Sequence, residues 1–381
     1  MSDLLLVDDL PLVSVIIPAY NAAELIEKTL NSVLDQTYYH IEVFVIDDGS
    51  TDDTAAVVRS VAQRDSRVIL LHQCNSGVAA ARNLGIRQAK GEFIAPIDAD
   101  DLWYPDNLQR QVTCFLSSSA SLGVVYSWSI DIDASDRPIG EFHAATIEGD
   151  VYSTLLCHNF LGNASCTMIR KSCLAAVGGY NSEFRLQQAQ GCEDWDLYLR
   201  LAARYEFRAA PEFLVGYRKI QHSMSRDYRA MARSQALMLQ VAKQDNPAVP
   251  AFLYRLSRSS FYLYLAQQCS LNGDDRGTLF WLAEALQAEA ITPLLRPGFY
   301  KMAVQSWRRG SRAATSTPPI KNTQMLSSRP SPLSLFLKLQ VGRILHQIMR
   351  WVTPSLLSES GMLAGSIEIN SCGSDRFADQ K

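Results

Sequence analysis

Short apolar segments alternate with amphipathic segments over the first part of the chain, and this alternation limits the fold more than any other feature. Three apolar runs, 13–17, 41–46 and 68–71, have the length and composition of buried strands. Each is followed by a segment whose apolar residues have helical spacing. Repeated strand–helix units predict a mainly parallel sheet with helices on both faces, so the predicted fold class is α/β.

A fourth apolar run, Phe93–Ile97, ends in three carboxylates within four residues, Asp98, Asp100 and Asp101. On an extended backbone Asp98 and Asp100 would point the same way. Oxygen ligands that converge at a strand end suit a hard divalent cation such as Mg²⁺ or Mn²⁺. The alternative is a solvated acidic turn that caps a helix starting near Pro105, and we expect Asp101 to serve as that cap.

Polar residues also follow the first two strands, Tyr20 and Asn21 after one and Asp47 and Asp48 after the other. The carboxyl ends of parallel strands share one edge, where open α/β sheets bind ligands, so the strand ends predict one cleft. The sequence lacks the glycine-rich motif of dinucleotide sites and the phosphate-binding P-loop motif, and we expect neither site. Asp47 and Asp48 would accept hydrogen bonds from a base or a ribose, or simply form a turn and cap the next helix.

Composition excludes some classes of function. A net charge of −3 argues against a nucleic-acid-binding protein. The eight cysteines are scattered with no C-x-x-C pair, which favours reduced thiols in a cytoplasmic protein over disulfides or a zinc site. The extension 1–11 lacks the basic start of a secretory signal, and no window approaches the roughly 20 apolar residues of a membrane span. We expect a cytoplasmic protein that reaches a membrane, if at all, from its inner face.

Four ordered motifs carry a resemblance to a known family: SVIIPAYN (14–21), VIDDGSTD (45–52), NSGVAAARN (75–83) and DADD (98–101). Their order and spacing resemble glycosyltransferase family 2. Its members are inverting enzymes of the GT-A fold that use nucleotide-activated sugars. The resemblance implies a GT-A-type sheet with a Rossmann-like nucleotide-binding half, which we place at residues 12–226, and a divalent metal cofactor, Mn²⁺ or Mg²⁺.

The resemblance also assigns roles to single residues. Those that would bind the nucleotide are Pro18 and Tyr20 beside the base, Asn21, Asp47 in a supporting turn, Asp48 on the base, Arg82 near the phosphates and Asp98 on the ribose or donor sugar. Asp100 would hold the metal on the diphosphate, with Asp98 and His222 as further candidate ligands. Arg218 ends the last predicted strand, Glu212–Arg218, and His222 follows it; family members reach the diphosphate or the metal from these positions.

The general base is expected in the segment GCEDWDLYLRL, at the start of a predicted helix. Acidic residues at a helix N-terminus are often there only to balance the helix dipole, and the residues alone favour that reading of Glu193 and Asp194. The resemblance implies instead that Asp194 is the catalytic base, with Glu193 as second choice. The Q-x-x-R-W pattern of processive members is missing, which favours the transfer of one sugar per encounter.

The rest of the chain reads as helical. We assign residues 227–310 to a helical region with one pair of helices similar to a tetratricopeptide repeat, 311–332 to a flexible linker and 354–381 to a disordered tail. Residues 333–353 form an amphipathic helix with basic residues on its polar side. That composition suits contact with a membrane surface or a partner, or docking on the protein's own core.

The predicted reaction is transfer of a sugar from a nucleoside-diphosphate sugar, with a UDP-sugar as the expected donor, to a hydroxyl of a glycan or a lipid-linked acceptor. Two alternatives remain open from the sequence. One is a non-catalytic adaptor that binds sugar nucleotides and recruits an assembly. The other is a phosphohydrolase of the haloacid-dehalogenase type with Asp98 as nucleophile, for which Leu102 is a poor match and the fourth strand an unusual place.

Overall fold

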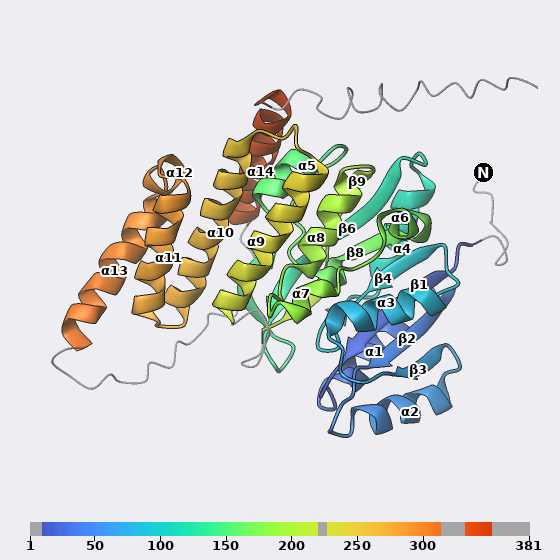
Figure 1. The fold of residues 1–381 in the computed structure, drawn as a ribbon. Coiled ribbons are helices and arrows are strands. Elements are labelled where there is room, and N and C mark those ends of the chain that lie inside the picture. Colours follow the sequence, from blue (N-terminus) through green and yellow to red (C-terminus); the bar gives the residue numbers. More distant parts are fainter. Residues whose placement is uncertain (1–9, 220–226, 314–331, 353–381) are drawn as a thin grey trace, which may run out of the picture.

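The computed structural model describes residues 10–219, 227–313 and 332–352. Figure 1 shows a curled sheet with helices on both faces, followed by a row of helices on one side of the sheet. Within the described residues the strands form one nine-stranded sheet in the order β3-β2-β1-β4-β8-β6-β9-β5, with β7 paired to β6. This arrangement confirms the predicted α/β class.

The first half of the sheet is parallel, as predicted. Its strands are β1 (Val13–Ala19), β2 (Ile41–Asp47), β3 (Val68–His72) and β4 (Phe93–Pro96), and its helices are α1 (Ile26–Leu34), α2 (Thr54–Arg64) and α3 (Val78–Gln88). Alternate residues of β1 enter different cores, because successive side chains of a strand point to opposite faces. Ile16 packs in one apolar cluster, and Val15 and Ile17 pack in the other, with Ile26 and Leu30 of α1.

The second half of the sheet is mixed. Its strands are β5 (Leu102–Trp103), β6 (Leu122–Ile132), β7 (Pro138–His143), β8 (Thr167–Arg170) and β9 (Glu206–Arg218). β6 runs parallel to β9 but antiparallel to β7 and β8. The sequence of residues 130–150 predicts an irregular loop, and this prediction is wrong in part, because β6 continues to Ile132 and returns as β7. The helices here are α4 (Asn107–Leu116), α5 (Tyr152–Cys157), α6 (Lys171–Val177), α7 (Glu183–Leu186) and α8 (Glu193–Ala202).

The helical region packs directly on the sheet domain. It contains α9 (Tyr228–Asp245), α10 (Ala251–Leu271), α11 (Asp275–Ala288), α12 (Ile291–Leu294) and α13 (Pro297–Ala313). The ring of Trp195 on α8 lies 5.8 Å from that of Phe261 on α10, and the Cys157 thiol of α5 donates to the carbonyl of Leu253. One continuous apolar cluster therefore joins the two regions.

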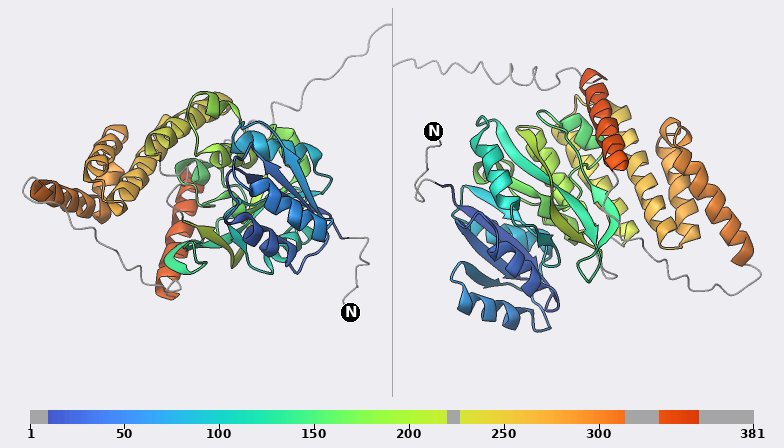
Figure 2. Two further views of the ribbon diagram at one scale, coloured as in Figure 1. Left: turned by 90° about the horizontal axis from the view of Figure 1, so that it is seen from below. Right: turned by 180° about the vertical axis from the view of Figure 1, so that it is seen from behind.

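The last described helix, α14 (Pro332–Val352), returns to the sheet domain and lies beside α5 (Figure 2). Leu335 and Leu339 pack against the cluster of Trp128 and Phe142, and the Thr154 hydroxyl lies 2.7 Å from Nδ1 of His346. The docked arrangement expected as one of three alternatives is the one observed. Part of the helix still exposes apolar side chains, namely Phe336, Val341, Ile344 and Leu345.

Some predictions concern residues outside the described ranges. They are the first nine residues, most of the linker, His222 and the tail from 354 onward. Across the described ranges, no helix is both long enough and apolar enough to cross a membrane.

Candidate functional site

The sheet register brings three strand ends together. Ala19 at the end of β1 pairs with Asp47 at the end of β2, and Ile16 of β1 pairs with Pro96, the last residue of β4. The polar residues that follow these strands therefore share the carboxyl edge of the parallel half. This is the edge where parallel α/β sheets bind ligands.

The turn after β2 is held by Asp47. Its carboxylate accepts hydrogen bonds from the Ser50 backbone N–H at 2.9 Å and lies 3.0 Å from Nδ1 of His72. Position 49 requires glycine for two reasons. Its φ is +77°, and a Cβ there would lie 2.9 Å from the backbone nitrogen of Asn75. Asp47 thus shapes the turn and keeps the neighbouring Asp48 in place.

Asp48 is 4% exposed, and its carboxylate accepts three hydrogen bonds. The donors are Nε2 of Gln73 and the backbone N–H groups of Ser76 and Gly77, at 2.7, 2.7 and 2.8 Å. These bonds fix the loop that leads into α3. A carboxylate offers about four lone-pair sites, so one acceptor position is left for a ligand. The base contact expected of Asp48 stays a prediction.

The residues after β1 line the same edge. Tyr20 is 51% exposed, so its ring is free to lie against a planar ligand, and Pro18 is half-buried next to it. Asn21 has a φ of +50°, and its side-chain oxygen accepts from the Thr51 N–H at 2.8 Å. Asn21 therefore ties the end of β1 to the loop after β2.

The acidic turn after β4 differs from the expectation. β4 ends at Pro96, so Asp98 and Asp100 do not stand on an extended strand. The expected helix cap is also wrong, because α4 begins at Asn107 and Asp101 is fully buried below the turn. Its carboxylate accepts from the Ser165 hydroxyl at 2.5 Å and from the Arg218 N–H at 2.8 Å.

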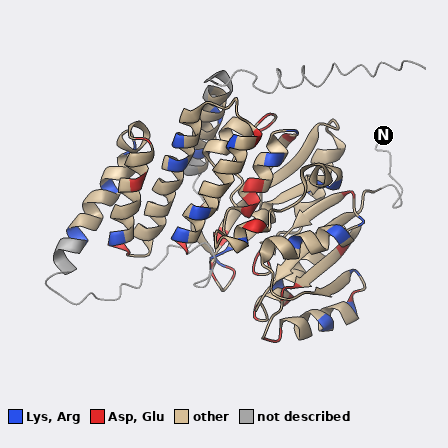
Figure 3. Cartoon of the chain, in the orientation of Figure 1, with Lys and Arg blue, Asp and Glu red and all other residues tan. Residues whose placement is uncertain are grey.

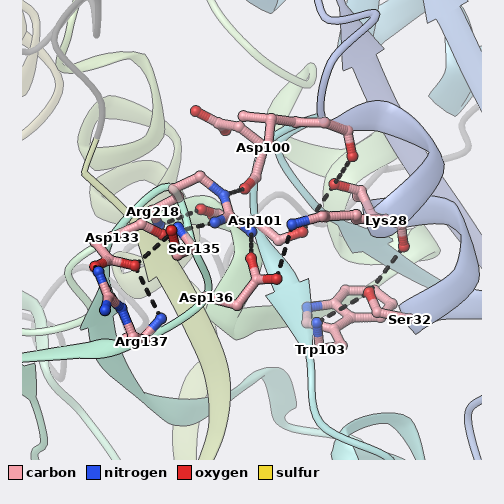
Figure 4. Close-up of polar contacts among 12 residues, drawn as sticks. Lys28, Ser32, Asp100, Asp101, Trp103, Asp133, Ser135, Asp136, Arg137 and Arg218 are labelled. Atoms are coloured by element: carbon pink, nitrogen blue, oxygen red, sulfur yellow. Dashed lines mark hydrogen bonds and ion pairs between the residues drawn. The ribbon is translucent and has the colours of Figure 1, made fainter.

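Arg218 braces this turn from β9 (Figure 4). Its side chain donates from Nε to the carbonyl of Asp100 at 2.6 Å and from Nη1 to the carbonyl of Asp133 at 2.7 Å. A 2.6 Å ion pair joins its Nη2 to Asp136, in the turn between β6 and β7. The guanidinium therefore faces the protein, while the diphosphate contact expected of Arg218 stays a prediction.

Arg82 connects two carboxylates that lie far apart in the sequence. Its guanidinium is only 3% exposed and donates to Asp194 at 2.6 Å and to Asp98 at 2.5 Å. The same guanidinium lies 5.1 Å from the ring centre of Tyr180. The phosphate contact expected of Arg82 stays a prediction. What the structure adds is that this residue joins Asp98 to Asp194.

Asp194 is placed by the start of α8, and its side chain is 27% exposed. Burial raises its pKa to about 6, and the nearby charge of Arg82 limits the rise. Burial also raises the pKa of Glu193. Its carboxylate accepts a hydrogen bond from the Gly191 N–H at 2.7 Å and so stabilises the loop just before α8. Of the two acids, Asp194 is the one paired with Arg82 in the cleft.

Two consecutive glycines, Gly178 and Gly179, lie next to the group formed by Arg82, Asp98 and Asp194. The Asn83 side chain donates to the Tyr180 carbonyl at 2.7 Å and accepts from its N–H at 2.9 Å, which ties the segment to α3. Gly179 has a φ of +73°, and a Cβ there would lie 2.8 Å from the Asn83 oxygen. A pair of glycines in the sequence predicts a tight backbone approach, and the structure shows that approach at Gly179.

The acidic turn has the chemistry of a hard metal site without a preformed ligand cage. Burial and the charge of Asp98 raise the pKa of Asp100 to about 6, so these carboxylates repel one another. A bound dication would relieve that repulsion, and carboxylate oxygens are its preferred ligands. Among the described residues, no group of three or more His, Cys, Asp or Glu side chains is arranged to hold a metal by itself. His222 lies outside the described ranges.

A family model described as glycosyl transferase family 2 matches residues 14–178, which contain all four motifs. This segment is a glycosyltransferase family 2 domain. A putative teichuronic acid biosynthesis glycosyltransferase, TuaG of Bacillus subtilis, is 41% identical over 112 residues, 29% of this chain and 44% of that protein. The chondroitin synthase of Escherichia coli is 29% identical over 214 residues, 56% of this chain and 29% of that protein. The chain thus spans less than half the length of these curated relatives.

Solved structures share the fold of this chain. The mannosyltransferase PcManGT from Pyrobaculum calidifontis, in complex with GDP-Man and Mn²⁺, has a TM-score of 0.52 at 22% identity, over 89% of this chain and 86% of that one. S. aureus TarS residues 1–349, in complex with UDP-GlcNAc, has a TM-score of 0.52 at 17% identity, over 84% and 98%. These likenesses confirm the predicted GT-A-type fold.

The sequence did not predict some residues of the candidate site. Ser165 and Asp136 hold the acidic turn through Asp101 and Arg218, and Asn83 anchors the segment of Tyr180. Asn83 lies within a recognised motif, so its position was a usable signal. Ser165 and Asp136 had none, because each acts through a contact distant in sequence.

Proposed function

We propose that this glycosyltransferase moves a sugar from a nucleoside-diphosphate sugar to a hydroxyl of a glycan or a lipid-linked acceptor, with inversion at the anomeric carbon. One observation carries the proposal: Arg82 joins Asp98, in the turn after β4, to Asp194, at the start of α8. Asp98, which would face the donor sugar, and Asp194, whose pKa of about 6 suits a base, thus lie in one partly buried cluster. The family 2 domain and the fold support this reading.

Asp194 acts as the general base. A base works best when its pKa lies near the working pH, and the pKa of about 6 for Asp194 leaves it mostly deprotonated at neutral pH. Arg82 fixes the orientation of the carboxylate and favours its charged form. The acceptor hydroxyl loses its proton to Asp194 as its oxygen attacks the anomeric carbon. Attack from the face opposite the departing nucleoside diphosphate inverts the configuration.

The nucleotide lies along the ends of β1 and β2 in this proposal. The exposed ring of Tyr20 and the neighbouring Pro18 flank the base, and the remaining acceptor site of Asp48 takes a base N–H. A UDP-sugar is the proposed donor. Asn21 and Asp47 hold the two loops in position, and Asp98 lies toward the ribose and donor sugar.

Mn²⁺ or Mg²⁺ is the proposed cofactor. Asp100 would hold it, with Asp98 beside it, since these carboxylates already repel one another. Bound there, a dication supplies a Lewis acid that neutralises charge on the diphosphate. Thr29 of α1, whose hydroxyl donates to the carbonyls of Ala99 and Asp101 at 2.9 Å, helps Arg218 to keep the turn rigid.

The stereochemistry of transfer tests this proposal. Purified full-length protein would be given UDP-, GDP- and dTDP-sugars with Mn²⁺ and a panel of acceptors, and the anomeric configuration of the product would be determined by NMR. An α-linked donor should give a β-linked product. Retention would refute the base mechanism. Sugar-nucleotide binding without transfer to any acceptor would favour the adaptor, and a trapped phospho-aspartate at Asp98 the phosphohydrolase.

A further inference from the structure

A groove of about 640 Å³ runs between α9 and α10, outside the site described above. It is open to solvent, and its floor includes the apolar side chain of Leu237. Its rim carries four basic residues, all exposed: Arg233, Lys243, Arg255 and Arg258. Figure 3 marks basic positions along both helices, next to the acidic start of α8.

The charge of this surface is opposite to that of the chain. Residues 228–271, which cover α9 and α10, contain five Arg or Lys residues and one acidic residue, Asp245, whereas the whole chain has a net charge of −3. In the described part of the chain no Asp or Glu lines the groove. Guanidinium groups match carboxylate and phosphate oxygens with paired hydrogen bonds, so the groove is complementary to an anion.

The groove begins at the loop that precedes Glu193 and Asp194 at the start of α8. Gln187, at one end of the lining, belongs to the loop 187–192 between α7 and α8. Arg233 of α9 donates from Nε and Nη2 to the carbonyl of Gln188 at 3.0 and 2.8 Å. In the same loop the Cys192 N–H donates to the Ser234 hydroxyl of α9 at 3.1 Å. α9 therefore holds the loop that leads to Asp194.

Backbone geometry shows how closely this loop lies on α9. Gly191 has a φ of +115°, and a Cβ there would lie 2.9 Å from Cγ of Met231. From Arg233 the rim continues along α9 to Lys243, which spans about 15 Å at the rise of an α-helix. A ligand in the groove therefore extends from the catalytic loop along the helical region.

We propose that this groove binds the acceptor, and that the acceptor is a glycan chain carrying negative charges. The inference rests on the proposed transferase function and adds the chemical class of its second substrate. Lys243, Arg255 and Arg258 hold the anionic groups, and the apolar floor lies against the sugar rings. The end of the chain passes the loop 187–192 and presents its hydroxyl to Asp194.

Binding of a defined probe tests the proposal. Fluorescently labelled oligogalacturonate would be titrated against full-length protein by polarisation, and its methyl-esterified form, which keeps the sugars and loses the charge, would serve as the control ligand. The charged probe should bind at least about tenfold more tightly, and added salt should weaken its binding. Inorganic polyphosphate would serve as a probe that has charge without sugar.

Two triple variants provide a matched comparison. Lys243→Gln, Arg255→Gln and Arg258→Gln remove three positive charges from the groove. Arg64→Gln, Arg110→Gln and Arg137→Gln remove three from exposed surface pairs elsewhere. The groove variant should lose at least about tenfold in affinity for the charged probe, while the control variant should bind it as wild type does.

Three results would overturn the proposal. They are equal loss in both variants, unchanged binding by the groove variant, and polyphosphate binding as tight as that of the oligosaccharide. Titration with the sugar-nucleotide donor distinguishes a failure of the proposed transferase function from a failure of the proposed acceptor groove. A protein that binds no donor refutes the transferase function, whereas donor binding without charge-selective oligosaccharide binding refutes only the groove.

Discussion

Replacing Arg82 should move the pH dependence of the reaction. Arg82→Gln removes a charge-assisted hydrogen bond to Asp194, 2.6 Å long in the structure. Such bonds contribute about 1.5–3 kcal/mol, and one pKa unit corresponds to about 1.4 kcal/mol. The pKa of Asp194, which is about 6 in the wild type, should therefore rise by roughly one to two pH units. A base must be deprotonated to act, so the variant should lose most activity on the acid side.

The assay is nucleoside diphosphate release at sub-saturating donor and acceptor, where the rate reports the pKa values of the free enzyme, measured from about pH 5.5 to about pH 9. The midpoint of the acid limb of the wild-type profile should lie near pH 6. In Arg82→Gln this midpoint should move upward by about one to two pH units. Arg82→Lys keeps a positive charge and should shift less. An unchanged acid limb in Arg82→Gln, at any level of activity, would refute the assignment of Arg82 and Asp194 as a coupled pair.

Three further changes test the supports of the site. Arg218→Ala removes a buried guanidinium that donates to the carbonyls of Asp100 and Asp133 and pairs with Asp136, and it should lower the free energy of unfolding by roughly 3 kcal/mol. Arg137→Ala, whose side chain is 70% exposed, should change it by less than about 0.5 kcal/mol in urea titrations. Gly179→Ala should destabilise more than Gly178→Ala, because both glycines have positive φ but only a Cβ at Gly179 meets another atom; equal melting temperatures would contradict this. The exposed apolar residues of α14 predict vesicle binding, so Phe336→Ser with Ile344→Ser should weaken sedimentation with anionic liposomes, and equal sedimentation would count against membrane contact.

The fold could be predicted largely from the sequence because its first half follows simple periodicity. Strands such as β1 and helices such as α3 are local patterns of apolar residues. The sequence predicts a strand over 13–17 and a helix over 78–89, and β1 and α3 span Val13–Ala19 and Val78–Gln88. β7 was missed because its sequence, Pro138–His143, has two apolar side chains and a glycine and gains its pairing only from β6. Tertiary pairing, not propensity, makes that segment a strand.

The sequence predicted which residues form the candidate site, but not the contacts between them. The resemblance identified Asp98, Asp194 and Arg82, but not that the arginine, which lies 112 positions before Asp194 in the sequence, joins the two acids. Asp101 was assigned to a helix cap because an acid before a helix has that local signature. Its actual role depends on Arg218 and on Ser165, which no local pattern connects to it.

The most direct test of the account separates binding from chemistry at Asp194. Donor affinity by calorimetry and single-turnover release of nucleoside diphosphate would be measured for wild type and Asp194→Asn in the same preparation. The account predicts similar donor affinity and a rate lower by about 10²–10⁴-fold, the usual contribution of a general base. A variant that turns over at the wild-type rate would contradict the assignment of Asp194 as the base.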